Sequence, residues 1–320
     1  MIHALENEKE IDMNFQSVLN QILVLFLTLV VGYLARRCNV FAEQTTKGLS
    51  SLLLKVALPA LIIDSLQQSF TPELLRASGQ ILVIAFLVYA ACGLLAFFVG
   101  KLLRAPATDI GVYRFALLFS NVGFMGYPVV NAVFGSEAVF YAAIYNLPFN
   151  LIVFTLGILI ISLGGQKSVQ KINARMFINP ATVAVAIGFT LFLLSVELPR
   201  PVATTVSQLG SLTTPLSMIL IGALLANTRI GETLGNWRVY VVCALRLLLI
   251  PLAIWSVLRL MTSDPLLIGV PTIIAAMPVA ANTAILAQEY DGNSLLASQL
   301  VFVSTLLSII TIPLLAYLVV

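Results

Sequence analysis

Two stretches of the sequence combine residues that break helices with side chains that need hydrogen bonds. The first, FSNVGFMGYPVVNAVFG, covers 119–135 and contains glycines, a proline and two asparagines. The second, AAMPVAANTAIL, covers 275–286 and contains a proline, an asparagine and a threonine. A helix break inside a membrane frees backbone groups that must find other partners. Because the half-helix after a break presents a partly positive N-terminus, the two stretches together predict an anion site.

We expect Gly123, Gly126 and Pro128 to open a turn in the first stretch, and Pro278 to do so in the second. The side-chain amides of Asn121, Asn131 and Asn282 are costly to bury unpaired, so they should bond freed backbone groups, a substrate, or both. The alternative is a pair of ordinary kinks with small-residue packing faces, which membrane helices often contain. The asparagines favour the functional interpretation.

The elements that position these stretches are membrane-spanning helices. The chain has 320 residues, of which 60% are hydrophobic and 10% charged, and a soluble domain cannot bury that much apolar surface. A span needs about 20 mostly apolar residues. Ten ranges meet that condition: 17–35, 48–66, 79–103, 112–133, 138–163, 176–196, 204–226, 237–260, 266–287 and 294–318. The predicted fold class is an all-α polytopic membrane protein.

The positive charges between these spans predict their orientation. Eleven Lys and Arg residues lie on one side of the predicted spans and three on the other. Since positively charged loops stay in the cytoplasm, the first side is predicted to be cytoplasmic. Both termini then face outward, and the expected location is the inner membrane.

The two halves of the chain resemble each other. "LKVALPALIIDSL" in the second span corresponds to "LTTPLSMILIGAL" in the seventh, and "GYPVVNAVFG" in the fourth to "AAMPVAANTAIL" in the ninth. The alternative is chance similarity between Ala- and Val-rich helices. Five spans per half would give the halves opposite orientations, which is typical of inverted-repeat transporters. We therefore predict a tail at 1–16, a first repeat at 17–163, a cytoplasmic linker at 164–175 and a second repeat at 176–320.

The tail, MIHALENEKEIDMNFQ, is polar and acidic and lacks the positive region of a signal peptide. Met13 begins a run that looks like a natural start of the protein. We expect residues 1–12 to be a disordered extension or a misassigned start.

The composition argues against several other classes of protein. The only histidine is His3, and the three cysteines are far apart, so no metal site, cofactor or Ser-His-Asp triad is predicted. An intramembrane enzyme would also need paired acids or another catalytic pair at depth. No basic aromatic patch suggests nucleic acid, and no ring-forming motif suggests a channel or sensor. The expected partners are a small organic anion and the lipid bilayer; the oligomeric state stays open, a homodimer included.

Two positive charges fall inside predicted spans. Lys55 lies about 10 Å inside the second span and Arg246 about 13 Å inside the eighth, at 1.5 Å per residue. Such charges are costly and usually functional, although a long side chain can also reach back to the headgroups, which suits Lys55. We expect Arg246 to add positive potential near an anion path. Tyr127, Tyr145 and Asn146 could line the same cavity, or serve only in packing.

No carboxylate falls convincingly at mid-depth. Asp64, Glu73, Glu137, Glu289 and Asp291 all lie near span ends or in loops. Proton-coupled carriers usually keep an acid in the membrane, so a uniporter driven by gradient and potential is favoured. Moving one charge through 100 mV is worth about 2.3 kcal/mol, which favours export of an anion from a negative-inside cell. A sodium- or proton-coupled symporter of the bile-acid-symporter type is the alternative, since freed carbonyls and amides can hold sodium without an acid.

The chain resembles the auxin efflux carrier family, which includes bacterial permeases and the plant PIN-type auxin carriers. The resemblance rests on "NQILVLFLTLVVGYLARR", "LSSLLLKVALPALIIDSL", "FSNVGFMGYPVVNAVFG" and "AAMPVAANTAILAQEYD", and it covers nearly the whole chain from Met13. It implies that spans four and nine are interrupted at Pro128 and Pro278 and cross in the membrane centre. It further implies that Asn121 binds a substrate carboxylate and that Asn150 lies near a cavity-lining position. The plant carriers have a long loop where this chain has about a dozen residues, so regulation through that loop is not expected.

The function predicted from these features is alternating-access transport of small organic anions such as malate, malonate or auxin-like acids, without enzymatic activity. The predicted substrate-binding residues are Asn121, Gly123, Gly126, Tyr127, Pro128, Asn131, Asn146, Asn150, Pro278, Asn282 and Thr283, with Arg246 and Lys55 as charges near the path.

Overall fold

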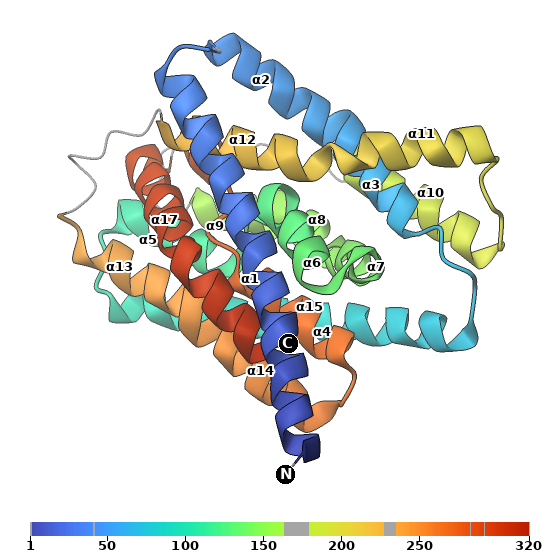
Figure 1. Ribbon diagram of the computed structural model, residues 1–320. Coiled ribbons are helices and arrows are strands. Elements are labelled where there is room, and N and C mark those ends of the chain that lie inside the picture. Colours follow the sequence, from blue (N-terminus) through green and yellow to red (C-terminus); the bar gives the residue numbers. More distant parts are fainter. Residues whose placement is uncertain are drawn as a thin grey trace.

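The computed structural model describes residues 2–40, 42–162, 179–226, 235–281, 283–290 and 292–319. In these residues the regular structure is helical, apart from one isolated antiparallel bridge between Ser120 and Val279 (Figure 1). The predicted all-α class is therefore confirmed for the described part of the chain. The linker predicted at 164–175 lies outside it.

The helices of the first half follow one another closely; η marks a wider, π-helical turn. They are α1 (Ile2–Arg37), α2 (Glu43–Leu52), η1 (Leu53–Ala57), α3 (Leu58–Ser65), α4 (Pro72–Leu102), α5 (Ala107–Leu118), η2 (Val122–Gly126), α6 (Tyr127–Phe134), α7 (Ser136–Tyr145), α8 (Leu147–Ile152), η3 (Val153–Gly157) and α9 (Ile158–Ile161).

The second half has the same all-helical character. Its elements are α10 (Pro180–Leu193), α11 (Arg200–Ser211), α12 (Thr213–Ala226), α13 (Trp237–Ala244), η6 (Leu245–Leu249), α14 (Ile250–Met261), α15 (Pro265–Ala276), α16 (Thr283–Glu289) and α17 (Ser294–Val319).

Among the described residues, each of the ten predicted span ranges overlaps one helix or several helices that follow one another. Six helices among the described residues are long and apolar enough to cross a membrane: Leu19–Arg37, Gln44–Ser65, Pro72–Val99, Arg200–Ala226, Trp237–Met261 and Ser294–Val319. Three shorter apolar helices are Val122–Phe134, Pro180–Leu193 and Pro265–Ala276. The ranges predicted at 112–133 and 266–287 are both interrupted, which explains why they contain no single long helix.

The N-terminal tail, which we expected to be a disordered extension or a misassigned start, is described as part of a helix. Helix α1 begins at Ile2 and continues without interruption to Arg37. The tail contains three glutamates and no glycine or proline, so nothing in it interrupts a helix, and extending an existing helix costs far less than starting a new one.

Prolines account for three of the four wide turns among the described residues. Pro59, Pro128 and Pro251 each stand at the second residue of the α-helix that directly follows a π-helical segment. Proline lacks an N–H and its ring collides with the carbonyl four residues earlier, so the preceding turn widens to accommodate it. The helix continues beyond each of these prolines, which therefore widen a helix rather than end it.

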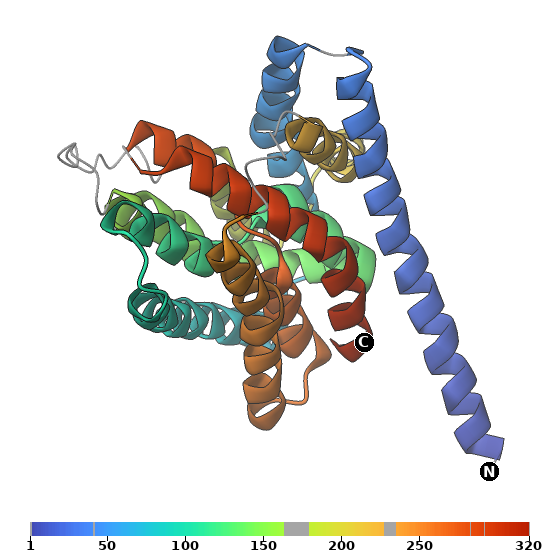
Figure 2. The same cartoon turned by 90° about the vertical axis from the view of Figure 1, so that its left-hand side faces the viewer.

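The helices form two groups, each drawn from both halves of the chain. In the first group, α1 packs along α12, and α3 packs against α10 and α11 (Figure 2). The second group contains α4–α9 and α13–α17, in which α4 packs on α5 and α15 on α14 and α17. The groups meet where α1 and α12 contact α6 and η2, and where α3 contacts α7.

The contact between α1 and α12 depends on two glycines. A Cβ atom at Gly32 would collide with the backbone of Ile219, and one at Gly222 would collide with Leu29 O and lie 2.6 Å from Tyr33 N. Small residues let helix backbones approach closely, which is how membrane helices gain packing energy without a hydrophobic driving force.

Gly222→Ala is accordingly expected to destabilise the protein by about 2 kcal/mol or more, because the new methyl group forces two backbones apart. Thermal unfolding in detergent measures the effect. Gly93→Ala is the matched control, since a Cβ atom there meets no atom within 4 Å. Equal melting temperatures for the two variants would show that the α1–α12 contact is looser than described.

The described loops are joined in a regular pattern. Arg238, the second residue of α13, donates to Leu103 O at 3.0 Å, and Asn293, just before α17, donates to Asp109 Oδ1 at 2.9 Å. The end of α4 and the start of α5 therefore lie beside the start of α13 and the residue that precedes α17. Elsewhere, Leu198 N donates to Gln67 Oε1 at 3.3 Å, which joins the α3–α4 loop to the α10–α11 loop.

Candidate functional site

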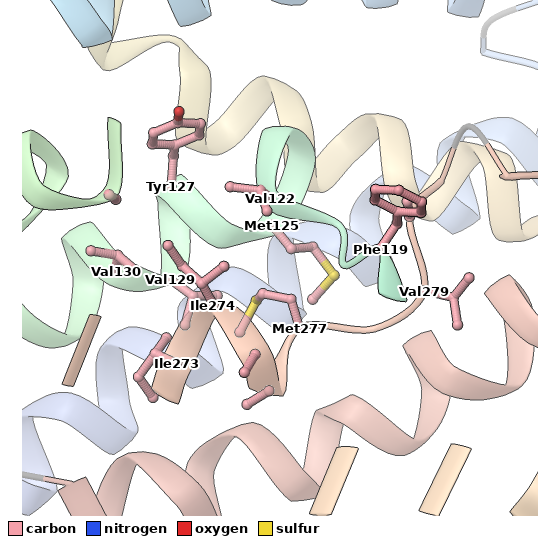
Figure 3. Close-up of a cluster of buried hydrophobic side chains, with 14 of the residues drawn as sticks. Phe119, Val122, Met125, Tyr127, Val129, Val130, Ile273, Ile274, Met277 and Val279 are labelled. Atoms are coloured by element: carbon pink, nitrogen blue, oxygen red, sulfur yellow. The ribbon is translucent and has the colours of Figure 1, made fainter. Parts of the chain in front are cut away.

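The two interrupted helices meet in the interior of the protein. Asn121 N donates to Pro278 O at 2.8 Å, and Ala280 N donates to Phe119 O at 3.2 Å. These bonds flank the bridge between Ser120 and Val279. We call this contact between residues 119–121 and 278–280 the crossing. Figure 3 shows Phe119 and Val279 from the two segments side by side, with Met125 and Met277 close by.

The crossing is buried, and most of its backbone groups have identified partners. All residues from 115 to 122 and from 269 to 280 are buried. Val279 N donates to Ser304 Oγ at 3.1 Å, and Thr283 Oγ1 donates to Ala280 O at 2.6 Å. Asn121 O accepts from Met125 N and Gly126 N, which starts η2. Backbone groups of the facing segment, together with the side chains of Ser304 and Thr283, thus replace the helical hydrogen bonds that the breaks remove, as an apolar environment requires.

Arg246 joins the two breaks from a third helix. Its side chain lies in η6 and is 2% exposed. Nη1 donates to Leu117 O at 2.9 Å, in the last turn of α5, and Nε donates to Met277 O at 3.3 Å, at the end of α15. A cation is favourable at a helix C-terminus because the carbonyls there carry partial negative charge. Arg246 therefore caps two broken helices at once.

A small cavity lies beside Arg246 and the crossing. Its volume is about 10 Å³, measured as the space open to the centre of a water molecule. Its wall includes Tyr89, Cys92, Ser120 and Tyr145. That room suits roughly one water molecule. The described residues that line this cavity beside Arg246 include two phenols and a thiol but no carboxylate.

Asn121 is the predicted residue that stands closest to the crossing. It is 3% exposed, and its main chain is fixed by hydrogen bonds on both sides. Its side-chain amide makes no hydrogen bond to the other described residues. A buried amide without such a bond is available to a ligand.

The first break lies before the glycines and the proline that we expected to cause it. Helix α5 ends at Leu118, and Phe119 has an extended backbone with φ −111° and ψ 117°. Pro128 lies in α6, beyond the crossing, where η2 accommodates it. The prediction that the interruption and the crossover fall on Pro128 is therefore wrong. Pro278 contributes its carbonyl oxygen to the crossing.

The other predicted residues divide by position. Gly123 and Gly126 form part of η2, and Asn131 is half-buried in α6. Tyr127 is buried, with its hydroxyl hydrogen-bonded to the buried Asn146, and its ring lies at the opposite side of the cluster from Phe119 (Figure 3).

Thr283 is buried and bonds the crossing directly through Ala280 O. Lys55 is exposed in η1, so the structure does not bury its charge as it buries that of Arg246. Asn282 and the side chain of Asn150 lie outside the described residues.

Ser304 was not predicted, although it bonds the second break directly. Its signal in the sequence is a polar stripe in the apolar helix α17, where Ser304, Thr305 and Ser308 are all buried. Polar side chains that recur on one buried face of a membrane helix usually bond a neighbouring helix.

Ser304→Ala is expected to destabilise the protein by about 1–3 kcal/mol, because Val279 N loses its acceptor in a buried place. Thermal unfolding in detergent measures the loss. Ser308→Ala is the control, because that buried hydroxyl donates to Thr305 O of its own helix. A loss no larger than that of the control would show that Ser304 does not support the crossing.

Comparison with known proteins agrees with a transport role. Residues 17–316 match the model of a family described as membrane transport protein. An uncharacterized transporter of Methanothermobacter thermautotrophicus is 28% identical over 94% of this chain and 98% of its own length. A protein of Rhizobium meliloti named as a candidate malonate transporter is 26% identical over 93% of this chain and 94% of its own. The uncharacterized transporter YfdV of Escherichia coli is 21% identical over 93% of this chain and 96% of its own length. The chain thus belongs to the membrane transport protein family, the auxin efflux carrier family that its motifs resemble.

Proposed function

We propose that this protein is a secondary carrier that moves small organic anions of the carboxylate class across the inner membrane by alternating access. The observation that carries the proposal is the crossing, where two interrupted helices meet in a buried place beside a buried arginine and a buried amide. Interrupted helices at the centre of a membrane protein are where such carriers hold their substrates.

Ten spans in two inverted repeats are part of the proposal. The two helix groups support it, because the first contains spans one and two with spans six and seven, and the second contains spans three to five with eight to ten. Each group therefore takes matching spans from both halves. The hydrogen bonds between segments that connect the spans also support successive spans running in opposite directions. One set joins the segments that follow spans three, seven and nine, and another bond joins the segments that follow spans two and six. Both termini then face outward.

The chemistry of the crossing favours an anion. Arg246 brings a buried positive charge to a cavity that no carboxylate lines among the described residues. The Asn121 amide can donate to a carboxylate oxygen. The relative named as a candidate malonate transporter agrees with a short carboxylate, which we therefore choose as the first substrate to test.

Movement of one helix group against the other would provide alternating access. Helices α6 and η2, which continue from the crossing, lie at the contact with α1 and α12. A substrate at the crossing is thus close to the surface along which the groups would move. The membrane potential, worth about 2.3 kcal/mol per charge at 100 mV, would drive the anion outward.

Counterflow in liposomes tests the carrier mechanism. Proteoliposomes loaded with unlabelled malonate should transiently accumulate labelled malonate above its equilibrium level, because a carrier exchanges one substrate for another. Uptake that only equilibrates, at a rate that does not saturate, would indicate a channel instead.

A further inference from the structure

The crossing contains oxygen atoms that would suit a small cation. Leu117 O and Met277 O belong to the C-terminal ends of α5 and α15, which carry partial negative charge. In carriers with interrupted helices, unwound carbonyls and the C-terminal ends of half-helices are the ligands that coordinate coupling ions. In this protein the same type of oxygen accepts hydrogen bonds from one guanidinium group.

We propose that Arg246 is a built-in cation, which permanently holds the position that a dissociable coupling ion would otherwise take. Its charge is fixed because a guanidinium does not lose its proton in proteins. The carrier would then need no sodium at the crossing. The role of Arg246 in holding the two helix ends together is independent of the proposed function, whereas its consequence for ion coupling rests on the proposed function.

The geometry explains why the residue is an arginine. Two different nitrogen atoms, Nη1 and Nε, reach carbonyls from two different helices. A planar guanidinium presents several donors in a fixed arrangement, whereas a lysine offers one compact ammonium group. Arg246 is therefore a positioning residue that keeps the ends of α5 and α15 together.

The charge of Arg246 has a second consequence. Its identified hydrogen-bond partners are neutral carbonyls, and no carboxylate is among the described residues that line the adjacent cavity. Leu117, which it contacts, is four residues from Asn121 in the chain. An anion bound at Asn121 would therefore gain a favourable electrostatic interaction, which is strong in a buried place of low dielectric constant.

Thermal unfolding of the purified protein in detergent tests the built-in cation without any substrate. We expect wild type to melt at the same temperature in sodium chloride and in choline chloride. Arg246→Ala should melt lower by about 4 °C or more, because two buried carbonyls lose a charged donor. Guanidinium chloride, well below denaturing concentrations, should recover part of that loss. Arg259→Ala is the control, because Arg259 is exposed, and guanidinium should not stabilise it.

Arg246→Lys provides a second variant in case the alanine protein does not fold. It keeps the charge but loses one of the two helix contacts, so its melting temperature should lie below that of wild type and be equal in sodium and choline. Specific stabilisation of wild type by sodium would overturn the proposal. The proposal would also be overturned if Arg246→Ala had the same melting temperature as wild type. The same holds if guanidinium raised the melting temperature of Arg246→Ala no more than that of Arg259→Ala.

Malonate uptake into liposomes tests the role of the charge. Arg246→Gln should raise the KM for malonate by about tenfold, the expected order for losing one charge-assisted interaction, while Arg246→Lys should keep KM near wild type. A purely structural role would lower the maximal rate of both variants and leave KM unchanged. If wild type takes up no malonate while the melting results agree, the proposed substrate fails and the built-in cation stands.

Discussion

Asn121→Ala should reduce carboxylate transport by at least about tenfold, the loss expected when one hydrogen bond to a charged ligand is removed. The amount of folded protein should stay near that of wild type. The side chain is buried but makes no hydrogen bond to other described residues, whereas the main chain holds the crossing together. Alanine keeps those main-chain bonds, so transport and stability should separate. Initial rates of malonate uptake and melting temperatures measure the two effects.

Asn121→Asp sharpens this test because it keeps the shape of the side chain and adds a negative charge. If the site binds an anion, the aspartate should impair transport at least as much as the alanine. Gln80→Ala removes an amide from an exposed position of α4 and should leave transport unchanged. Wild-type uptake by Asn121→Ala would remove this residue from the substrate site.

Pro278→Ala is the second change with a large expected effect. Helix α15 ends at Ala276, and the chain then turns so that Met277 O meets Arg246 and Pro278 O meets Asn121 N. An alanine supplies the N–H that proline lacks and lets the helix continue. Both contacts would then be lost, and uptake should fall by about tenfold or more, the scale of one to two lost buried hydrogen bonds.

Pro271→Ala is the matched control, since Pro271 lies inside the same helix and away from the crossing. It should change the transport rate far less than Pro278→Ala. Equal transport rates for Pro278→Ala and wild type would mean that the helix break persists without the proline and that transport does not require Pro278.

The helices were predictable from the sequence because apolar runs of sufficient length are a strong signal. Six of these ranges overlap a helix long and apolar enough to cross a membrane among the described residues, and the other four overlap shorter helices. The exact place of the first break was not predictable. Proline and glycine indicate where a helix can widen, but α5 ends at Leu118 because Phe119 and Asn121 bond another segment some 160 residues later in the chain. Such a bond has no local pattern.

The candidate site was predictable only in part, for a similar reason. Asn121, Pro278 and Arg246 stand out because polar groups, prolines and charges are rare in apolar helices. Their partners do not stand out: Arg246 donates to the main-chain carbonyls of Leu117 and Met277, whose side chains are ordinary apolar ones. The sequence therefore indicates a charge in the membrane but does not show that it joins two helices.

The direct test of anion transport is the electric current produced when malonate is added to proteoliposomes on a sensor surface. The account predicts a saturable current that needs neither sodium nor a pH gradient, is absent from empty liposomes and is strongly reduced by Asn121→Ala. Folded protein that gives no current with malonate, malate or an indole carboxylate would contradict the proposed function. A current that appears only with sodium would contradict potential-driven uniport, and with it the built-in cation at Arg246.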